Sequence, residues 1–370
     1  MRWLIAAGGT GGHVFPALSL AQEVTQKDPT ARVLFVGTPR GLEARVVPAK
    51  GFALKTVSAR GLMGMGWMAV ARTLLGLPWV AFRCALILAR FRPHIVVGMG
   101  GYVAGPVVFL AALWGLPTAI AEQNTVAGRT NRFLGRFVDR VFLSFPEAMD
   151  RFFESKAVVT GNPVREELVE ASSKALPPAW EGKPGDEFHL LIFGGSQGAR
   201  ALNEAMVEAL PMLERFPFSL QIVHQAGKNQ VEALRRAYGR SGLGHRVVDF
   251  IESMQEVYLW AHLVICRAGA ASLAEIALFG LPSILIPFPH AVDDHQRENA
   301  KVFQAAGASV MVDQRELSGA SLAQLVAALA GDPGRLKEMA AAARRLARPR
   351  AAAAMVEECM ALVGKKGCKR

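Results

Sequence analysis

The sequence predicts an α/β protein made of two doubly wound domains. Short β-branched or apolar runs alternate with helix-compatible segments, which is typical of βαβ units in a mostly parallel sheet. A strand, a glycine-rich loop and a helix open the chain, and the same succession begins again at residue 188. The stretch between the two repeats contains Pro177-Pro178 and few apolar residues, which indicates a linker. A length of 370 residues corresponds to about two ordinary domains.

The N-terminal half contains short strands that glycine or proline delimits. We expect strands at 3–7, 32–37, 94–98 and 117–121. The first strand leads into Gly8-Gly9-Thr10-Gly11-Gly12-His13 and a helix expected from about residue 15 to residue 26. We place the N-terminal domain at residues 1–163.

The C-terminal half repeats this organisation. We expect strands at 188–193, 220–224, 263–266 and 283–286, and a helix at 200–213. The Ala-rich stretch 334–363 is helix-compatible. We place the C-terminal domain at 164–345, with a linker at about 171–187 and a helical tail at 346–370.

Composition and charge exclude several classes of protein. A hydrophobic content of 51% excludes a disordered chain. The four cysteines are widely spaced and form no C-x-x-C pair, which favours reduced thiols over disulfides or a zinc site. Residues 1–163 carry 18 Lys and Arg against 8 Asp and Glu, whereas the remainder carries 24 against 23. The excess of positive charge therefore predicts an anionic partner, nucleic acid or lipid, for the N-terminal half.

Three glycine-rich loops directly follow predicted strands. They are Gly8 to His13, Gly98-Met99-Gly100-Gly101-Tyr102, and Gly194-Gly195-Ser196-Gln197-Gly198. The first is neither a dinucleotide fingerprint, because Val14 stands where the third glycine belongs, nor a P-loop, because no Gly-Lys-Ser/Thr follows it. Glycines after a strand let the backbone approach an anion at the next helix N-terminus. Three such loops predict substrates that carry several phosphates, bound in a cleft at the carboxyl ends of the strands.

The segment from Arg267 to Glu275 predicts a nucleotide site. Gly269 marks the turn into a helix whose first turn holds Ala270, Ala271 and Ser272, so their N–H groups can take a diphosphate. Glu275 follows Ser272 by one turn on the same helix face and can accept both hydroxyls of a ribose.

Two residues are candidates for a general base. His13 follows the first glycine loop, and its ordinary pKa suits proton transfer near neutral pH. Glu122, in Glu122-Gln123-Asn124, is the alternative at the end of the next predicted strand. The chain contains no D-x-D sequence, which favours helix N-termini over a metal ion as the holder of a diphosphate. We expect no metal and no cofactor.

Taken together, these motifs resemble the MurG family of lipid-linked N-acetylglucosaminyltransferases of bacterial peptidoglycan synthesis. The loops above, the Glu122-Gln123-Asn124 segment, Thr160-Gly161-Asn162-Pro163-Val164-Arg165 and the Arg267 to Glu275 segment occur in the same order, from end to end. The resemblance implies two Rossmann-like domains that face each other across a cleft, the glycosyltransferase B fold. It also implies UDP-N-acetylglucosamine as donor, mainly on the C-terminal domain, and an undecaprenyl-diphosphate-linked N-acetylmuramyl-pentapeptide as acceptor on the N-terminal domain.

The resemblance also assigns site residues. The implied donor contacts are Thr10, Gly11, Gly12, Asn124, Arg165, Ser196, Ile251, Ala270, Ala271, Ser272, Glu275 and Gln296. Gly100, Gly101 and Tyr102 are expected to bind the acceptor diphosphate. The implied reaction is an inverting transfer to the muramyl 4-hydroxyl by one direct displacement. Ala121 stands where related sequences often carry a histidine, so no catalytic role can be given to that position.

A membrane surface is the expected anionic partner. The segment from residue 62 to residue 82 is rich in apolar residues with arginines around it, and Leu62, Met65, Trp67, Leu75, Trp79 and Phe82 form the predicted patch. The apolar run 74–89 contains Pro78 and Arg83, so no membrane span is expected, and we place the protein peripherally on the cytoplasmic face of the cell membrane.

Two alternatives remain open at this point. One is a UDP-N-acetylglucosamine 2-epimerase on a similar fold, and the other is a non-catalytic nucleotide- or nucleic-acid-binding protein. Nucleic-acid binding predicts aromatic residues among the basic ones, whereas here the arginines lie among aliphatic residues, so we expect no nucleic-acid partner. Membership of a cell-wall synthesis complex is a further expectation that the sequence leaves open.

Overall fold

The computed structural model describes residues 1–58, 67–183, 185–195 and 198–367, and gives the backbone alone for 67–75, 77 and 367. The chain forms two compact units. Unit 1 consists of Met1–Glu166 and Arg348–Arg370, and unit 2 consists of Glu167–Ala347. The C-terminal segment therefore belongs to unit 1 and is no separate tail.

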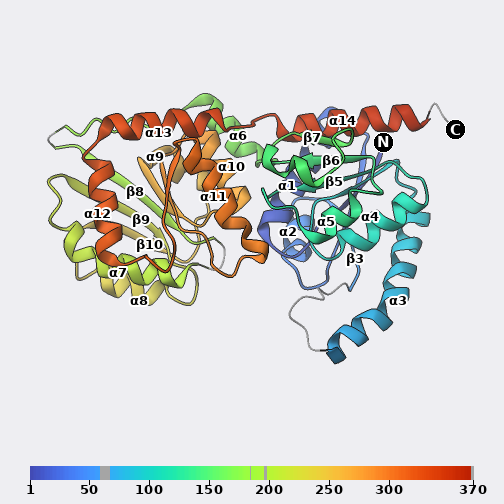
Figure 1. Cartoon of the computed structure of the whole chain (residues 1–370), viewed down its shortest axis with the longest axis horizontal. Helices are drawn as coiled ribbons and strands as arrows, with labels where there is room; N and C mark the ends of the chain where they lie inside the picture. Colours follow the sequence, from blue (N-terminus) through green and yellow to red (C-terminus); the bar gives the residue numbers. More distant parts are fainter. Residues whose placement is uncertain (59–66, 184, 196–197, 368–370) are drawn as a thin grey trace. The chain divides into compact units, whose positions relative to one another are not determined.

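Unit 1 is built on a parallel sheet of strand order β3-β2-β1-β4-β5-β6-β7 (Figure 1). Its strands are β1 (Arg2–Ala6), β2 (Arg32–Gly37), β3 (Ala53–Thr56), β4 (Ile95–Gly98), β5 (Thr118–Glu122), β6 (Arg140–Leu143) and β7 (Ala157–Val159). Its helices are α1 (Gly11–Lys27), α2 (Glu43–Ala49), α3 (Trp67–Phe91), α4 (Ala104–Leu113), α5 (Arg129–Leu134), the 3₁₀ helix η1 (Pro146–Arg151) and α14 (Ala351–Gly367). Helix α6 (Glu166–Lys174) begins at the boundary between the units.

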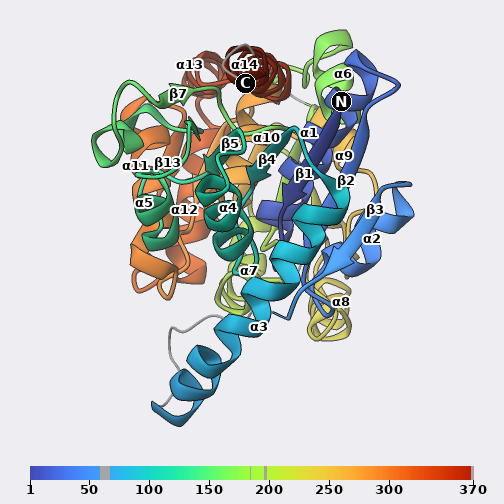
Figure 2. The ribbon, with the colours of Figure 1, turned by 90° about the vertical axis from the view of Figure 1, so that its right-hand side faces the viewer.

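Helices cover both faces of this sheet, which is why its central strands β1, β4 and β5 are buried on both sides. Side chains of α1, α2 and α14 pack on one face, and those of α3, α4 and α5 pack on the other. In Figure 2, α3 crosses in front of the strands and extends beyond the rest of unit 1. The strands predicted at 32–37 and 263–266 have the observed bounds, and the other predicted strands differ by one residue at one or both ends.

Unit 2 repeats the arrangement with the strand order β10-β9-β8-β11-β12-β13. Its strands are β8 (Glu187–Phe193), β9 (Ser219–Gln225), β10 (Gly244–Val248), β11 (Leu263–Cys266), β12 (Ser283–Leu285) and β13 (Ser309–Met311). Its helices are α7 (Arg200–Leu213), α8 (Val231–Tyr238), α9 (Met254–Trp260), α10 (Ala270–Phe279), the 3₁₀ helix η2 (Val292–Asp294), α11 (His295–Ala305), α12 (Gly319–Ala330) and α13 (Pro333–Arg345).

Three sequence expectations need correction. Helix α6 covers the first residues of the predicted linker 171–187, because Leu168 finds a buried site in this polar stretch. The predicted helical region 334–363 is two helices, α13 and α14, with a break at 346–350 where the chain passes from unit 2 to unit 1. The N-terminal domain extends three residues beyond the predicted boundary at 163, so Arg165 lies in unit 1.

Each sheet has one topological switch point, where the chain leaves two adjacent parallel strands in opposite directions. It lies between β1 and β4 in unit 1 and between β8 and β11 in unit 2. Ligands of doubly wound sheets bind at the carboxyl ends of these strands. The three predicted glycine loops and the Arg267 to Glu275 segment all follow these four strands.

Candidate active site

The two glycine loops of unit 1 touch at the switch point. Gly101 has a φ of +82°, and a Cβ there would lie 2.3 Å from the carbonyl oxygen of Gly8. Only glycine fits this position, because both the left-handed backbone and the close approach exclude a side chain. The loops after β1 and β4 therefore form one surface at the carboxyl edge of the sheet.

His13 lies on this surface. Helix α1 begins at Gly11 and not near residue 15, because Thr10 takes an extended conformation as N-cap and its carbonyl accepts the amides of His13 and Val14. The His13 imidazole packs against Gly100, since a Cβ on that glycine would lie 2.5 Å from His13 Cδ2. The structure thus brings together the candidate base and the predicted acceptor loop, whose Tyr102 side chain is 63% exposed.

A buried carboxylate that the sequence analysis did not select, Glu43, holds the first loop in place. Its Oε2 accepts the amide of Gly9 at 3.0 Å, and its Oε1 accepts both the amide and the hydroxyl of Thr38 at 2.7 Å. Glycines surround it, and a Cβ on Gly37 would lie 2.5 Å from Glu43 Cγ. A lone acidic residue closely preceded by two glycines was the only sequence signal of this role.

Glu122 lies at the end of β5 and is 3% exposed. Its Oε1 accepts the amide of Asn124 at 3.1 Å, and its Oε2 accepts the amide of Gly128 at 2.9 Å and the Asn131 side chain at 2.8 Å. Burial raises the pKa of this carboxyl above its ordinary value, and the hydrogen bonds act in the opposite direction. Both oxygens therefore hold the loop that carries Asn124, a predicted donor contact.

Arg165 packs against the same aromatic ring as the first glycine loop. Its guanidinium lies over the Phe15 ring, 5.4 Å from the centroid. The same ring packs on Gly11, where a Cβ would be 3.0 Å from Phe15 Cε2. The predicted donor contacts Gly11 and Arg165 therefore both pack against the Phe15 ring of α1.

In unit 2, the loop after β11 enters α10 as the sequence predicts. Gly269 is the N-cap, with φ −70° and ψ 138°, and Ala270, Ala271 and Ser272 form the first turn. The first amides of a helix have no partner within the helix, so this N-terminus favours an anion.

Glu275 lies one turn further along α10 and is oriented by a residue that the sequence analysis did not select. The hydroxyl of Tyr258, on α9, donates to Glu275 Oε2 at 2.9 Å. Tyr258 is fully buried, and its ring packs against Phe193 and Phe279 at centroid distances of 6.2 and 5.2 Å. A rigid partner therefore determines where the carboxylate points.

The remaining predicted donor residues of unit 2 lie on other loops. Gln296, in the first turn of α11, accepts the amide of Phe288 on its Oε1 at 3.0 Å. Ile251 follows β10 and is 5% exposed. Ser196 lies outside the described residues.

Gly198, the last residue of the predicted glycine loop of unit 2, packs against a buried polar network. Gly198 has a φ of +75°, and a Cβ there would lie 2.3 Å from the carbonyl oxygen of Ala226. Asn203 donates to that same oxygen at 2.9 Å, and its Oδ1 accepts His224 Nε2–H at 3.0 Å, while the Tyr238 hydroxyl donates to His224 Nδ1 at 2.9 Å. Burial lowers the pKa of His224 to about 3, so this histidine is neutral at physiological pH.

Within the described ranges, no group of three or more His, Cys, Asp or Glu side chains is placed to hold a metal ion.

Known proteins resemble this chain over nearly its whole length. The glycosyltransferase family 28 N-terminal domain matches residues 3–143, and the corresponding C-terminal domain matches residues 189–355. A protein of Syntrophus aciditrophicus is 47% identical over 98% of this chain and 99% of its own length. Its name is UDP-N-acetylglucosamine–N-acetylmuramyl-(pentapeptide) pyrophosphoryl-undecaprenol N-acetylglucosamine transferase. A protein of the same name from Geobacter sulfurreducens is 44% identical over 99% of this chain and all of its own length.

The chain belongs to the MurG family of glycosyltransferases.

Solved structures agree with this membership. The crystal structure of Acinetobacter baumannii MurG has a TM-score of 0.78 and 35% identity, covering 97% of this chain and 99% of its own. The UDP-N-acetylglucosamine 2-epimerase of Neisseria meningitidis has a TM-score of 0.66 at 14% identity, covering 96% and 99%. That likeness reflects the shared fold alone. The predicted glycosyltransferase B fold, with two parallel-sheet α/β domains, is confirmed, and the chain is a glycosyltransferase of the MurG family.

Proposed function

We propose that this enzyme transfers N-acetylglucosamine from UDP-N-acetylglucosamine to the muramyl 4-hydroxyl of the undecaprenyl-diphosphate-linked N-acetylmuramyl-pentapeptide. The observation that carries the proposal is an identity of 44–47%, over nearly the whole chain, to relatives whose names give this donor sugar and this lipid-linked acceptor. The polar groups at the two switch points supply the chemistry that such a reaction needs.

The donor nucleotide is assigned to the α10 region of unit 2. The amides of Ala270, Ala271 and Ser272 donate hydrogen bonds to the diphosphate. The Glu275 carboxylate, which Tyr258 orients, accepts hydrogen bonds from the two ribose hydroxyls. Gln296, Ile251 and Ser196, the last of which lies outside the described residues, are the other predicted donor contacts of unit 2. Thr10, Gly11, Gly12, Asn124 and Arg165 are the predicted donor contacts from unit 1.

The reaction is assigned as one displacement at the anomeric carbon. The acceptor oxygen forms the new bond on the face opposite the diphosphate while the bond to UDP breaks, so an α-linked donor gives a β-linked product. The hydroxyl proton goes to a base, and the UDP leaving group keeps the bonding electrons. Arg165 and the amides of α10 stabilise the negative charge that develops on UDP.

His13 is the preferred base for the acceptor hydroxyl. Its ring lies on Gly100, in the loop assigned to the acceptor diphosphate, which places an imidazole beside the expected acceptor. Glu122 is less suited to this task, because both its oxygens already accept hydrogen bonds from the loop they organise. A positioning role for Glu122 fits these contacts better.

We place the enzyme at the cytoplasmic face of the cell membrane, where unit 1 docks to reach its lipid substrate. Trp79 and Phe82 of α3 are 63% and 55% exposed, and their rings stack at 5.7 Å. Leu62 and Met65 lie outside the described residues, and only the backbone of Trp67 and Leu75 is described. No helix of the described part of the chain is long and apolar enough to cross a bilayer.

A second group of exposed apolar side chains, which the sequence analysis did not select, adds to this surface. Leu113 and Trp114 at the end of α4 are exposed, as are Phe133 and Phe137 in and after α5. Helix α4 packs against both α3 and α5. The exposed residues Arg132 and Arg136 accompany these side chains, and apolar groups with basic neighbours suit an anionic membrane.

The test of the reaction is transfer of radiolabelled sugar from UDP-N-acetylglucosamine into an organic-extractable, undecaprenyl-linked product. We expect label in the lipid fraction and release of one UDP for each sugar transferred. Formation of an epimerised free sugar or sugar nucleotide without labelled lipid would contradict the proposal and favour the epimerase alternative.

The test of docking is sedimentation with anionic vesicles. Replacing Trp79 and Phe82 with Ser is expected to lower vesicle binding and activity on a long-chain acceptor far more than activity on a short-chain, water-soluble acceptor. Binding should also fall with rising salt, whereas UDP binding should not. Equal losses on both acceptors would mean that the two aromatic residues only pack within the protein.

A further inference from the structure

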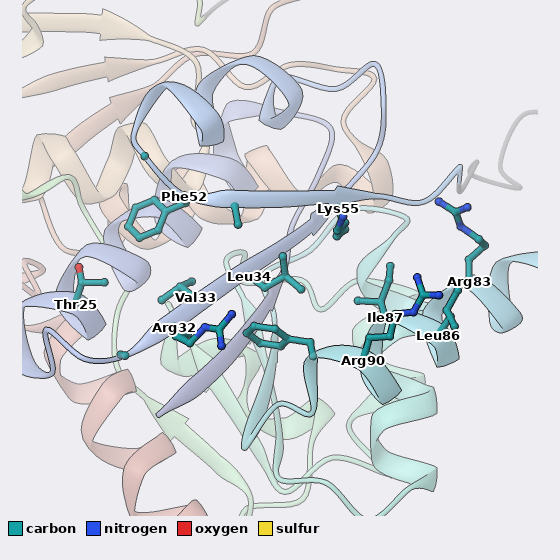
Figure 3. Close-up of a pocket in the computed structure, with 14 residues that line it drawn as sticks. Thr25, Arg32, Val33, Leu34, Phe52, Lys55, Arg83, Leu86, Ile87 and Arg90 are labelled. Atoms are coloured by element: carbon teal, nitrogen blue, oxygen red, sulfur yellow. The ribbon is translucent and has the colours of Figure 1, made fainter.

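A fully buried carboxylate, Glu43, lies in the connection between β2 and β3, at the first position of α2. The two strands also line a cavity of about 640 Å³ on their α3 side (Figure 3), with Leu34 of β2 and Lys55 of β3 among its residues. Glu43 does not line that cavity. Its described partners are two backbone amides and one hydroxyl, and no cation of the described part of the chain pairs with it. A buried charge is costly unless it is hydrogen-bonded, so the carboxylate and these three donors depend on one another.

Glycines make room for this carboxylate in two connections of the sheet. A Cβ on Gly8, after β1, would lie 2.7 Å from Glu43 Oε1. A Cβ on Gly41, after β2, would overlap both carboxylate oxygens. Glu43 therefore joins the loop after β1 to the loop after β2.

The hydrogen bond to Glu43 fixes the backbone of Gly9. Gly9 is exposed, has a φ of +93°, and a Cβ there would meet nothing within 4 Å, so packing does not hold it. Its amide donates to Glu43 Oε2 at 3.0 Å. Thr10, the N-cap of α1, follows directly, and His13 lies in the first turn of that helix. The orientation of Gly9 therefore determines where α1 begins and where His13 lies.

The same backbone segment also supports the loop assigned to the acceptor. Gly101 lies so close to the carbonyl oxygen of Gly8 that a side chain would not fit, and the neighbouring Gly100 packs against the His13 ring. Residues 8 and 9 thus contact the acceptor loop on one side and lead into the helix of His13 on the other. A displacement of this segment would change the distance between the imidazole and the acceptor loop.

We propose that Glu43 is a positioning residue for the sugar transfer, because it holds the backbone of residues 8 and 9 and thereby places the His13 imidazole beside the acceptor hydroxyl. The inference rests on the proposed function, in which His13 is the base and Gly100 and Gly101 bind the acceptor. A general base must lie within hydrogen-bond reach of the proton that it takes, so small displacements lower the rate. The nucleotide site assigned to unit 2 does not depend on this contact.

The substitution Glu43→Gln should break one contact of the carboxylate selectively. Thr38 offers two donors to Oε1, whereas Gly9 offers one donor to Oε2. A glutamine side chain has a single acceptor oxygen, which satisfies more donors when it faces Thr38, so its NH₂ group faces the Gly9 amide and releases it. Thr38→Val is the matched control, because it removes the hydroxyl donor to the same carboxylate and leaves the Gly9 contact in place.

The first experiment measures steady-state sugar transfer and UDP affinity for the full-length parent and both variants, well below their unfolding midpoints. We expect Glu43→Gln to lower kcat about 10–100-fold, because a misplacement of about 1 Å can cost that much. Its UDP affinity in calorimetry should equal that of the parent protein. Thr38→Val should keep both the kcat and the UDP affinity of the parent protein.

The second experiment repeats Glu43→Gln in a His13→Ala background under single-turnover conditions. If Glu43 acts through His13, removal of the imidazole leaves no base to position, so the added substitution should leave the rate of His13→Ala nearly unchanged. A residue that only stabilises the fold would lower the rate by the same factor in both backgrounds.

The third experiment does not depend on sugar transfer. In protein that carries ¹³C-labelled histidine, the His13 ring resonances are assigned by their loss in His13→Ala. We expect them to shift in Glu43→Gln and to stay in place in Thr38→Val, because only the first variant releases the Gly9 amide.

Three results would overturn the inference. Equal losses of kcat in Glu43→Gln and Thr38→Val would mean a general loosening of unit 1. The same factor of loss with and without the His13 imidazole would mean that Glu43 acts independently of the base. Unchanged His13 resonances in Glu43→Gln would mean that the carboxylate does not position this ring. If the parent protein forms no labelled lipid but the resonances shift as expected, the proposed reaction fails and the positioning of His13 by Glu43 stands.

Discussion

At the scale of single residues, buried hydrogen bonds orient the polar groups that the reaction needs. Tyr258 directs Glu275, and Glu43 fixes the loop beside Gly9. A buried polar group without its partner costs about 1–3 kcal/mol, so each of these contacts selects one orientation. The side chains expected to meet substrate are therefore held before it arrives.

Loss of the ribose contact should weaken nucleotide binding. Glu275→Ala is expected to weaken UDP binding by about 1.5–3 kcal/mol, because a charge-assisted hydrogen-bond acceptor is removed. Tyr258→Phe should weaken it by about 1 kcal/mol, since the carboxylate stays and only its orientation is released. Calorimetry measures both, with Glu256→Ala on the exposed side of α9 as control. Unchanged UDP affinity in Glu275→Ala would refute the ribose assignment.

Removal of the proposed base should lower turnover and leave the affinity for the donor nucleotide unchanged. His13→Ala is expected to lower kcat about 10²–10⁴-fold while UDP affinity stays nearly constant, because proton transfer is lost and the nucleotide site in unit 2 is intact. Steady-state kinetics and calorimetry on the same preparation separate the two effects. Collapse of UDP affinity would instead make His13 a donor-binding residue, and Glu122 would become the better candidate base.

Two neutral histidines of unit 2 should make its stability pH-dependent. Burial lowers the pKa of His224 to about 3 and that of His262 to about 4, both below the ordinary value of 6.5. Between pH 6.5 and pH 4 the unfolded chain takes up protons that the folded one excludes. The free energy of unfolding therefore falls as pH falls, by up to about 1.4 kcal/mol per pH unit for each histidine.

Urea denaturation between pH 7.5 and pH 4.5 measures this slope. His224→Gln keeps a donor and an acceptor but cannot titrate, so its slope should be smaller than that of the parent protein by up to about 1.4 kcal/mol per pH unit. The same slope in both proteins would show that His224 does not contribute.

At the scale of elements, glycines let adjacent strand–helix loops touch. Gly101→Ala is expected to lower the free energy of unfolding by about 2–4 kcal/mol, because a left-handed backbone and an overlap with Gly8 act together. Gly364→Ala in α14 is the matched control, since a Cβ there meets nothing within 4 Å. The control substitution should raise the free energy of unfolding by about 0.5–1 kcal/mol. Equal midpoints for both variants in thermal unfolding would contradict the close loop contact.

At the scale of the whole molecule, the last helix returns to the first domain. Helix α14 packs beside α1 (Figure 1), and Met355, Val356 and Cys359 lie fully buried against the sheet of unit 1. Lys27 pairs with Glu357 at 2.9 Å, and Arg140 pairs with Glu358 at 3.0 Å. The chain thus passes between the units twice, near residue 166 and near residue 348.

Two methionines of this helix test its packing. Met355→Ala should lower the free energy of unfolding by about 2–5 kcal/mol, because it opens a cavity under the sheet. Met360→Ala, at a side chain that is 44% exposed, should change it by less than about 0.5 kcal/mol. Loss of hydrogen-exchange protection in α1 should accompany only the first change. Similar effects of both substitutions would show that α14 is not held against the sheet of unit 1.

The order of apolar runs, glycine loops and helix-compatible segments predicts the class of fold and the loops that carry the candidate site. Apolar strands bounded by glycine or proline have a local signature, and so has a helix that opens at a glycine turn, as at Gly269. The edge strands β3, β7, β10 and β13 and the inner strand β6 were not predicted. Each takes its stability from neighbouring strands in the sheet and has little periodicity of its own.

The residues that orient the site could not be predicted, because the fold brings them together from distant parts of the chain. Glu43 comes 34 residues after Gly9, and Glu275 comes 17 residues after Tyr258, so no local pattern joins the partners. The same holds for α14, whose Ala-rich sequence predicts a helix but not the sheet it covers. Periodicity acts between residues a few positions apart, whereas burial and hydrogen bonding act between residues that the completed fold brings together.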